Sequence, residues 1–351
     1  MAPPWVVFDN AAVYRGHCSN GAEPDIAGVG VVISFVLASI ITTTASILAM
    51  ILDQAFDSKG QLSFRAPVKS IRERFLDTEW KKDYAWRPFL DPLIIGLGDQ
   101  QLFTGYAVLL SGWIKVAQRS FTASGAHFVL ILYICALSSS SHLAALITLR
   151  KYFGKYKLIA KIRMTLVVAF AVFLFTSMIA TIAMPQRNYS RKPDIVDRQQ
   201  NRARLCLLVP MFFMFIGFSI ALVCILTHPH RPGTESHFSS KSMGLLMRHV
   251  TNPKQLMHNP ANTGRSIVYY LFLNPLIAFC IQILLAVLSL ILVLSQKFSL
   301  PADSKHWCSL NSAEANLWGF GQTLSVVLLL LPAMAACQTY LEGRENIQGT
   351  Q

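Results

Sequence analysis

LIIGLGDQQL at residues 93–102 and ALSSSSHL at residues 136–143 are the two stretches that decide the fold. Each belongs to a segment apolar enough to cross a bilayer, yet together they carry an acid, two amides, four hydroxyls and an imidazole. Such groups are expensive in hydrocarbon, so they are expected to face the interior of a helix bundle or a wet cavity. The two stretches therefore predict a polar site inside the membrane.

The composition of the whole chain agrees with that interpretation. Of 351 residues, 53% are hydrophobic and only 14% are charged, which is more apolar surface than one soluble core can hide. The net charge of +13 would indicate nucleic acid in a soluble protein. Here the basic residues crowd the segments between apolar spans, where membrane topology explains them, so no nucleic-acid partner is expected.

The hydropathy pattern predicts an all-α fold, a bundle of seven transmembrane helices. Each apolar stretch reaches the roughly 20 residues that a bilayer requires. The expected spans are residues 26–52, 93–117, 125–149, 158–184, 205–227, 266–295 and 317–341. This divides the chain into a lumenal amino-terminal segment at 1–25, a membrane domain at 26–341 and a cytosolic tail at 342–351.

The distribution of basic residues predicts the orientation. Lys and Arg are more numerous in the segments 53–92, 150–163 and 228–265 than in those on the other side. The positive-inside rule therefore places the amino end in the lumen and the carboxyl end in the cytosol, with the endoplasmic reticulum as the expected membrane.

Three residues on the predicted lumenal side carry extracellular chemistry. Asn188 opens the sequon Asn188-Tyr189-Ser190 and is the expected glycosylation site. Cys18 and Cys308 precede the first and the seventh span, and an oxidising lumen would allow a disulfide between them. Two unpaired thiols are the other interpretation, because sequence cannot supply the geometry of a bridge.

Small residues and prolines within the spans predict packing and kinks. Gly98, Gly105 and Gly112 recur every seven residues, so they form one stripe where a neighbouring helix can approach closely. Pro210, Pro275 and Pro332 fall in the last three spans, and each leaves a carbonyl without its helical donor.

Asp99 and His142 are the candidate catalytic pair. By helical rise they lie roughly 9 and 12 Å from the cytosolic end, at similar depth. Asp99 would be an acid whose pKa is raised by desolvation, so that it can deliver a proton. Alternatively, it is a carboxylate satisfied by Gln100, His142 or a serine and holds two helices in register. His142 likewise orients the acid, or is itself satisfied by serines one turn back.

Four runs resemble a large group of filamentous-fungal membrane proteins with seven spans. They are PDIAGVGVVISF at 24–35, GLGDQQLFTGYAVLLSGW at 96–113, SSSSHLAALITLRKY at 138–152 and WGFGQTLSVVLLLLP at 318–332. Some heptahelical proteins of this general type, those of the ascofuranone and macrophorin pathways, are membrane-bound terpene cyclases. The chain has neither the aspartate-rich metal motif of soluble terpene cyclases nor a DxDD motif.

The resemblance implies proton-initiated cyclisation of a farnesylated intermediate in fungal meroterpenoid biosynthesis. That route requires an apolar chamber, one protonated acid and aromatic faces that stabilise carbocations, and it requires no metal or other cofactor. Besides Asp99 and His142, the substrate-binding candidates are Gln100, Gln101, Phe103, Tyr106, Trp113, Ser138, Ser139 and Asn274. The expected partners are a lipophilic prenylated molecule, membrane lipid and other enzymes of the pathway in the same membrane.

Two other function classes remain open from the sequence. A seven-span receptor or sensor would have a ligand pocket open to the lumen, whereas the deep polar group lies nearer the cytosol. A transporter could relay protons through an intramembrane acid, but no repeat relates the two halves of the chain. The depth of the polar group favours the enzyme.

Overall fold

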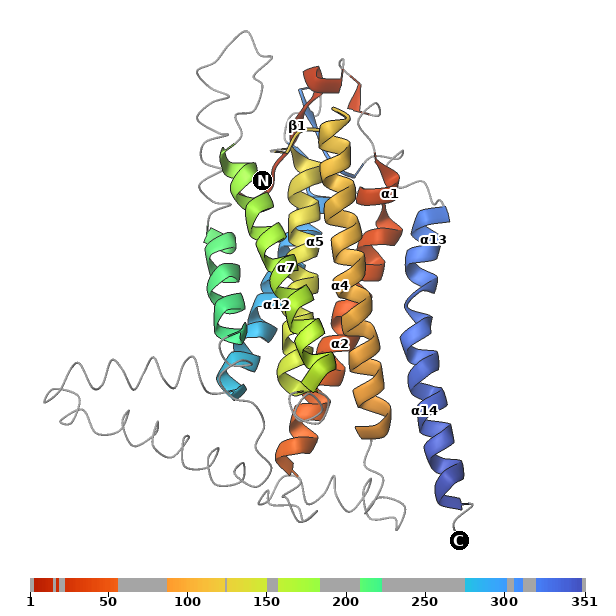
Figure 1. Cartoon of the computed structure of the whole chain (residues 1–351). Helices are drawn as coiled ribbons and strands as arrows, with labels where there is room; N and C mark the ends of the chain where they lie inside the picture. The colour runs from red at the N-terminus through yellow and green to blue at the C-terminus, as the bar shows by residue number, and fades with distance from the viewer. Residues whose placement is uncertain are drawn as a thin grey trace, which may run out of the picture.

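The computed structural model describes residues 3–14, 17–18, 23–55, 87–123, 125–149, 157–183, 209–222, 275–301, 306–311 and 320–348. These segments form a bundle of long helices, with the two chain ends at opposite ends of it (Figure 1). The helices are α1 (Pro24–Ala27), α2 (Val29–Ala55), α4 (Arg87–Ala117), α5 (Ala126–Thr148), α7 (Lys157–Ala183), α12 (Pro275–Phe298), α13 (Phe320–Val327) and α14 (Leu330–Gln348). A shorter apolar helix covers Val209–Leu222.

The helical class is confirmed, and the chain is a multi-pass membrane protein. Six helical segments in the described ranges are long and apolar enough to cross a bilayer: Pro24–Met50, Phe89–Ala117, Ala126–Thr148, Lys161–Ala183, Leu276–Phe298 and Gly321–Thr339. The seventh expected span, 205–227, is represented by the helix Val209–Leu222, which is shorter than these six. The structure therefore shows six candidate spans, and the count of seven is not confirmed.

Helix α5 is the centre of the bundle. All 23 of its residues are buried, and it packs against α2, α4, α7 and α12. In Figure 1 it runs between α4 and α7. A helix that other helices surround on every side can carry polar residues out of contact with lipid, which explains how the row Ser138–Ser141 is tolerated.

Helix α4 packs closely on α5 through the predicted glycine stripe. A Cβ added at Gly98 would lie 3.0 Å from His142 Nδ1, and one at Gly112 would lie 2.7 Å from Ile131 Cδ1. At Gly105 the nearest atom would be Phe170 Cζ of α7, at 3.1 Å. Only a residue without a side chain allows this approach, so the stripe has the structural role that its spacing indicates.

Pro332 breaks the last span, as expected. Helix α13 ends at Val327 and α14 begins at Leu330, because a proline at 332 removes the donor that the carbonyl of Leu328 would need. Helix α14 then continues to Gln348, so the carboxyl-terminal tail expected at 342–351 is helical over most of its length.

A compact cap covers the end of the bundle where the amino-terminal segment lies. Strand β1 (Asp9–Asn10) pairs antiparallel with β2 (Trp307–Cys308), and the 3-10 helix η1 (Ala11–Tyr14) follows β1. Cys18 and Cys308 form a disulfide with a Cα–Cα distance of 5.3 Å. Of the two interpretations that the sequence left open for these cysteines, the structure has the bridge.

The cap is also tied to the end of α12. The Trp5 indole donates a hydrogen bond to Ser295 Oγ at 2.9 Å. Gln296 bonds the backbone of Val7 in both directions, accepting from its N–H and donating to its carbonyl. The buried Lys297 donates to the Leu310 carbonyl at 2.7 Å. These bonds hold the amino-terminal segment over the bundle end.

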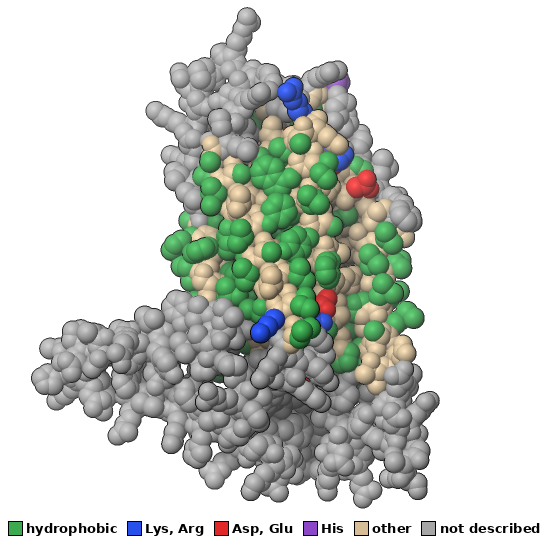
Figure 2. All heavy atoms as spheres, viewed as in Figure 1, with side chains coloured by type: hydrophobic (Ala, Val, Ile, Leu, Met, Phe, Trp, Pro, Cys, Tyr) green, Lys and Arg blue, Asp and Glu red, His purple; other side chains and the backbone are tan. Residues whose placement is uncertain are grey.

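The outer face of the bundle is apolar around its middle. In Figure 2 hydrophobic side chains cover the central band, and the visible charged side chains gather towards the two ends. Phe103 belongs to this surface, with 59% of its area exposed. The expectation that Phe103 lines an interior chamber is therefore wrong: its position on α4 faces away from α5.

Candidate functional site

The four consecutive serines of α5 divide between two faces of the helix. Successive residues are rotated by about 100°, so neighbours along the chain cannot share one face. Ser138 and Ser141 contact α4. Ser139 and Ser140 line a pocket on the other side, towards α7 and α12. The polar stretch therefore serves two separate places in the bundle interior.

On the α4 side, Gln101 is the centre of a buried polar cluster. Its Oε1 accepts a hydrogen bond from Ser141 Oγ at 2.6 Å, and its backbone carbonyl accepts one from Ser138 Oγ at 2.8 Å. Its Nε2 is buried without a hydrogen-bond partner, as is Oε1 of the neighbouring Gln100. Both glutamines thus keep unused hydrogen-bonding capacity in the interior.

His142 adds a second unused atom next to this cluster. Its Nδ1 lies 2.9 Å from the Gly98 carbonyl oxygen. A carbonyl only accepts, so Nδ1 carries the proton and a neutral His142 keeps a lone pair on Nε2. That Nε2 is buried and has no hydrogen-bond partner. The neutral ring can therefore accept a proton at Nε2 and, once charged, donate it from the same atom.

Asp99 has a partner that the sequence analysis did not consider. Arg163 of α7 donates from Nη2 to Asp99 Oδ2 at 2.6 Å. The contact is partly buried, with 33% of the Asp99 side chain and 17% of the Arg163 side chain exposed. A guanidinium at this distance favours the ionised carboxylate. Asp99 is therefore not the desolvated, protonated acid that we expected, and neither His142 nor a serine satisfies it.

Tyr106 and Trp113 have structural contacts of the same kind. The Tyr106 hydroxyl donates to the Leu166 carbonyl at 2.8 Å, and the Trp113 indole donates to Ser177 Oγ at 2.8 Å. Both side chains thus join α4 to α7. Neither lines the pocket behind α5, so the expected aromatic wall on α4 does not form around that pocket.

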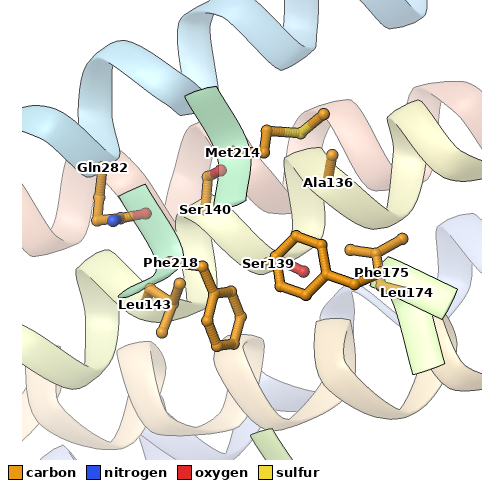
Figure 3. Close-up of a pocket in the computed structure, with 9 residues that line it drawn as sticks. All are labelled: Ala136, Ser139, Ser140, Leu143, Leu174, Phe175, Met214, Phe218 and Gln282. Carbon is orange, nitrogen blue, oxygen red and sulfur yellow. The ribbon is translucent and has the colours of Figure 1, made fainter. Parts of the chain in front are cut away.

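The pocket lies between α5, α7, α12 and the helix Val209–Leu222, and encloses about 250 Å³ of empty space. Figure 3 shows side chains from all four helices converging on it. The residues that line it are Ala136, Ser139, Ser140, Leu143, Leu174, Phe175, Met214, Phe218 and Gln282. Phe175 contacts Phe215 and Phe218 edge to face, with ring centroids 5.0 and 5.9 Å apart. Apolar and aromatic walls with a few polar groups are typical of a small-molecule site.

Gln282 is the polar group that reaches this pocket from α12. It is fully buried, and its Nε2 donates to the Gly217 carbonyl at 2.6 Å. Its Oε1 has no hydrogen-bond partner. An amide inside an apolar span is as unusual as Asp99 is, so the same rule could have singled out Gln282 from the sequence.

Two of the expected site residues lie outside the described ranges, Asn274 and Asn188. Within those ranges, no group of three or more His, Cys, Asp or Glu side chains could hold a metal ion. The chain matches no protein-family model, no curated protein and no solved structure. Any function must therefore be argued from the site itself.

Proposed function

We propose that the protein is a membrane-bound terpene cyclase that acts on a farnesylated intermediate of fungal meroterpenoid biosynthesis. The observation that carries the proposal is the pocket behind α5, whose walls are apolar and aromatic. A cation on a folding prenyl chain is stabilised by aromatic faces, which Phe175 and Phe218 supply. His142, next in the chain to the pocket residue Leu143, is the proposed proton carrier on the same turn of α5.

The proposed reaction is an isomerisation. A proton adds to the terminal alkene carbon, or to the oxygen of a terminal epoxide, and the neighbouring double bonds supply the electrons that close the rings. The last carbocation loses a proton from carbon, so the product has the mass of the substrate. His142 suits this cycle because Nε2 can release a proton at the start and accept one at the end.

The proposal places seven spans in the endoplasmic reticulum, with the amino end in the lumen. The opposite positions of the two chain ends support an odd number of crossings (Figure 1). The disulfide of the cap supports an oxidising environment on that side. We expect a glycosidase to increase the mobility of the chain on a gel, and an Asn188→Gln variant to lack this shift. Accessibility of the amino end to a cytosolic protease would overturn this orientation.

Feeding a fungal host that makes no meroterpenoids of its own tests the reaction. Cells that express the chain receive a farnesylated phenol with or without a terminal epoxide, and extracts are analysed by mass spectrometry. We expect a new isomer of unchanged mass. His142→Gln should abolish it, because glutamine can still donate to the Gly98 carbonyl but cannot carry a proton. Phe103→Leu, on the lipid-facing side of α4, should leave it unchanged.

A receptor or sensor is the competing function, and the same experiment separates the two. If every substrate is recovered unchanged while the protein is shown to be folded in membranes, the cyclase proposal fails. A product that persists in His142→Gln would keep the reaction but remove His142 as the proton carrier.

A further inference from the structure

Gln282 presents one atom to the pocket in a fixed orientation. Its Nε2 lies 2.6 Å from the Gly217 carbonyl oxygen. Because that carbonyl can only accept, the amide cannot be turned round, and the atom left over is the acceptor Oε1. Gly217 has no side chain to interfere, and a Cβ there would collide with Leu285. The close approach of two helices therefore sets the direction of the amide.

Oε1 of Gln282 is a buried acceptor with no donor in the described part of the chain. Buried polar atoms in proteins nearly always have a hydrogen-bond partner, so an exception within a pocket points to a ligand that supplies it. In Figure 3 the Gln282 side chain extends from α12 towards Ser140 of α5. The Ser139 hydroxyl, by contrast, already donates to the Cys135 carbonyl at 2.8 Å.

The remaining walls determine the chemistry of the ligand. Leu143, Leu174, Met214 and Phe218 are hydrocarbon or thioether surfaces, and no charged side chain lines the pocket. A cationic donor would be left without a counter-charge there, so the donor must be neutral. The empty space is also smaller than the roughly 300 Å³ at which ligand pockets begin, so it takes only the part of a ligand that bears the donor.

We propose that Gln282 Oε1 accepts a hydrogen bond from the hydroxyl of a lipophilic ligand, a phenol or an alcohol, bound in this pocket. Ser140, in the same wall, faces the other side of that hydroxyl. The inference rests on the proposed function in that the natural ligand would be its prenylated phenol. It adds the group by which this ligand is recognised and the end that enters the pocket.

Equilibrium binding to the purified full chain in lipid nanodiscs tests the assignment. The probes are a radiolabelled farnesylated phenol and its O-methyl ether, which differ only in the donor. We expect the ether to bind about five- to tenfold more weakly to the unmodified protein, the range of one neutral hydrogen bond. Gln282→Leu should bring the two affinities together by weakening the phenol. Gln338→Leu, the same change at an exposed position of α14, should keep the difference.

Equal affinities of phenol and ether for the unmodified protein would overturn the assignment, and would fit a water molecule on Oε1. This comparison needs no variant, so it stands even if Gln282→Leu fails to fold. Discrimination without any cyclised product would remove the cyclase and keep the hydroxyl site. Cyclisation of both probes with equal affinity would do the reverse.

Discussion

A carboxylate inside an apolar helix needs a cation or a donor, and Asp99 finds Arg163. The sequence could show that Asp99 is buried in a span, because its cost in lipid depends on that span alone. It could not show the partner. Arg163 was counted among the basic residues of the segment before α7, and nothing local places α7 beside α4.

The Asp99–Arg163 pair should stabilise the fold and leave catalysis to His142. Asp99→Asn removes the counter-charge of a partly buried guanidinium, so we expect a loss of about 1–3 kcal/mol in unfolding free energy. The double variant Asp99→Asn, Arg163→Gln should cost about 1 kcal/mol less than the sum of the single changes. Thermal unfolding in detergent measures both. Turnover per folded molecule should survive in Asp99→Asn; its loss there, with normal unfolding, would restore Asp99 as the acid.

Tyr14 in the cap gives a pH-dependent prediction. Its hydroxyl donates to Asp9 Oδ2 at 2.9 Å, and burial, followed by the negative charge of Asp9, raises the pKa of Tyr14 well above its usual value. A raised folded-state pKa contributes stability that is complete below the unfolded-state pKa of about 10 and declines as the pH rises above it. Tyr14→Phe lacks this term. The advantage of the unmodified protein in unfolding temperature should therefore shrink between pH 9 and 11, and a constant advantage would be inconsistent with the assignment.

At the scale of elements, α4 carries two sevenfold patterns side by side. Gly98, Gly105 and Gly112 form the close approach to α5. The next residue in each heptad bonds or stacks on α7: Asp99 with Arg163, Tyr106 with Phe170, and Trp113 with Ser177. Each pair is separated by 64 residues, so the two helices run parallel in constant register.

Only the first of these patterns could be predicted. A glycine stripe identifies itself, because no other residue type allows the same approach. The second pattern was read instead as an aromatic wall, since Tyr106 and Trp113 look alike whether they face a ligand or a helix. Pro332 was likewise predictable from its own chemistry.

Gly105 provides the test of the packing at this scale. Gly105→Leu would place a side chain against Phe170 and Ser138, and overpacking of this kind costs about 1–3 kcal/mol. Ala107→Leu is the matched control, because position 107 is exposed on the outer face of the same helix. Unfolding in detergent should be destabilised only by the first change. Equal effects of both would mean that α4 does not pack as described.

At the scale of the whole molecule, the disulfide joins parts of the chain that are 290 residues apart. It fastens the amino-terminal segment to the segment before the last helices and closes the cap. Cys18→Ser, Cys308→Ser and the double variant should each lower stability by the same amount, about 2–4 kcal/mol. A reducing agent should reproduce this loss in the unmodified protein and have no effect on the double variant. Additive losses from the single changes would indicate that the two thiols act separately.

The pocket was beyond prediction for a reason that belongs to this scale. Its walls come from residues 136–143, 174–175, 214–218 and 282, which only the assembled bundle brings together. The sequence could identify the helical class, most of the spans and the polar helix at the centre. Which face of α5 would meet aromatic side chains depended on the order of the helices around it.

The central claim is that a proton starts the cyclisation within this bundle, and solvent isotope incorporation tests it most directly. Purified protein in nanodiscs is incubated in D₂O with a farnesylated phenol that has a terminal alkene, and the product is analysed by mass spectrometry. Protonation of that alkene places one solvent deuteron on carbon, so the predicted product is an isomer heavier by about one mass unit than the same isomer formed in H₂O. A product without the deuteron, or no product from folded protein, would contradict the claim.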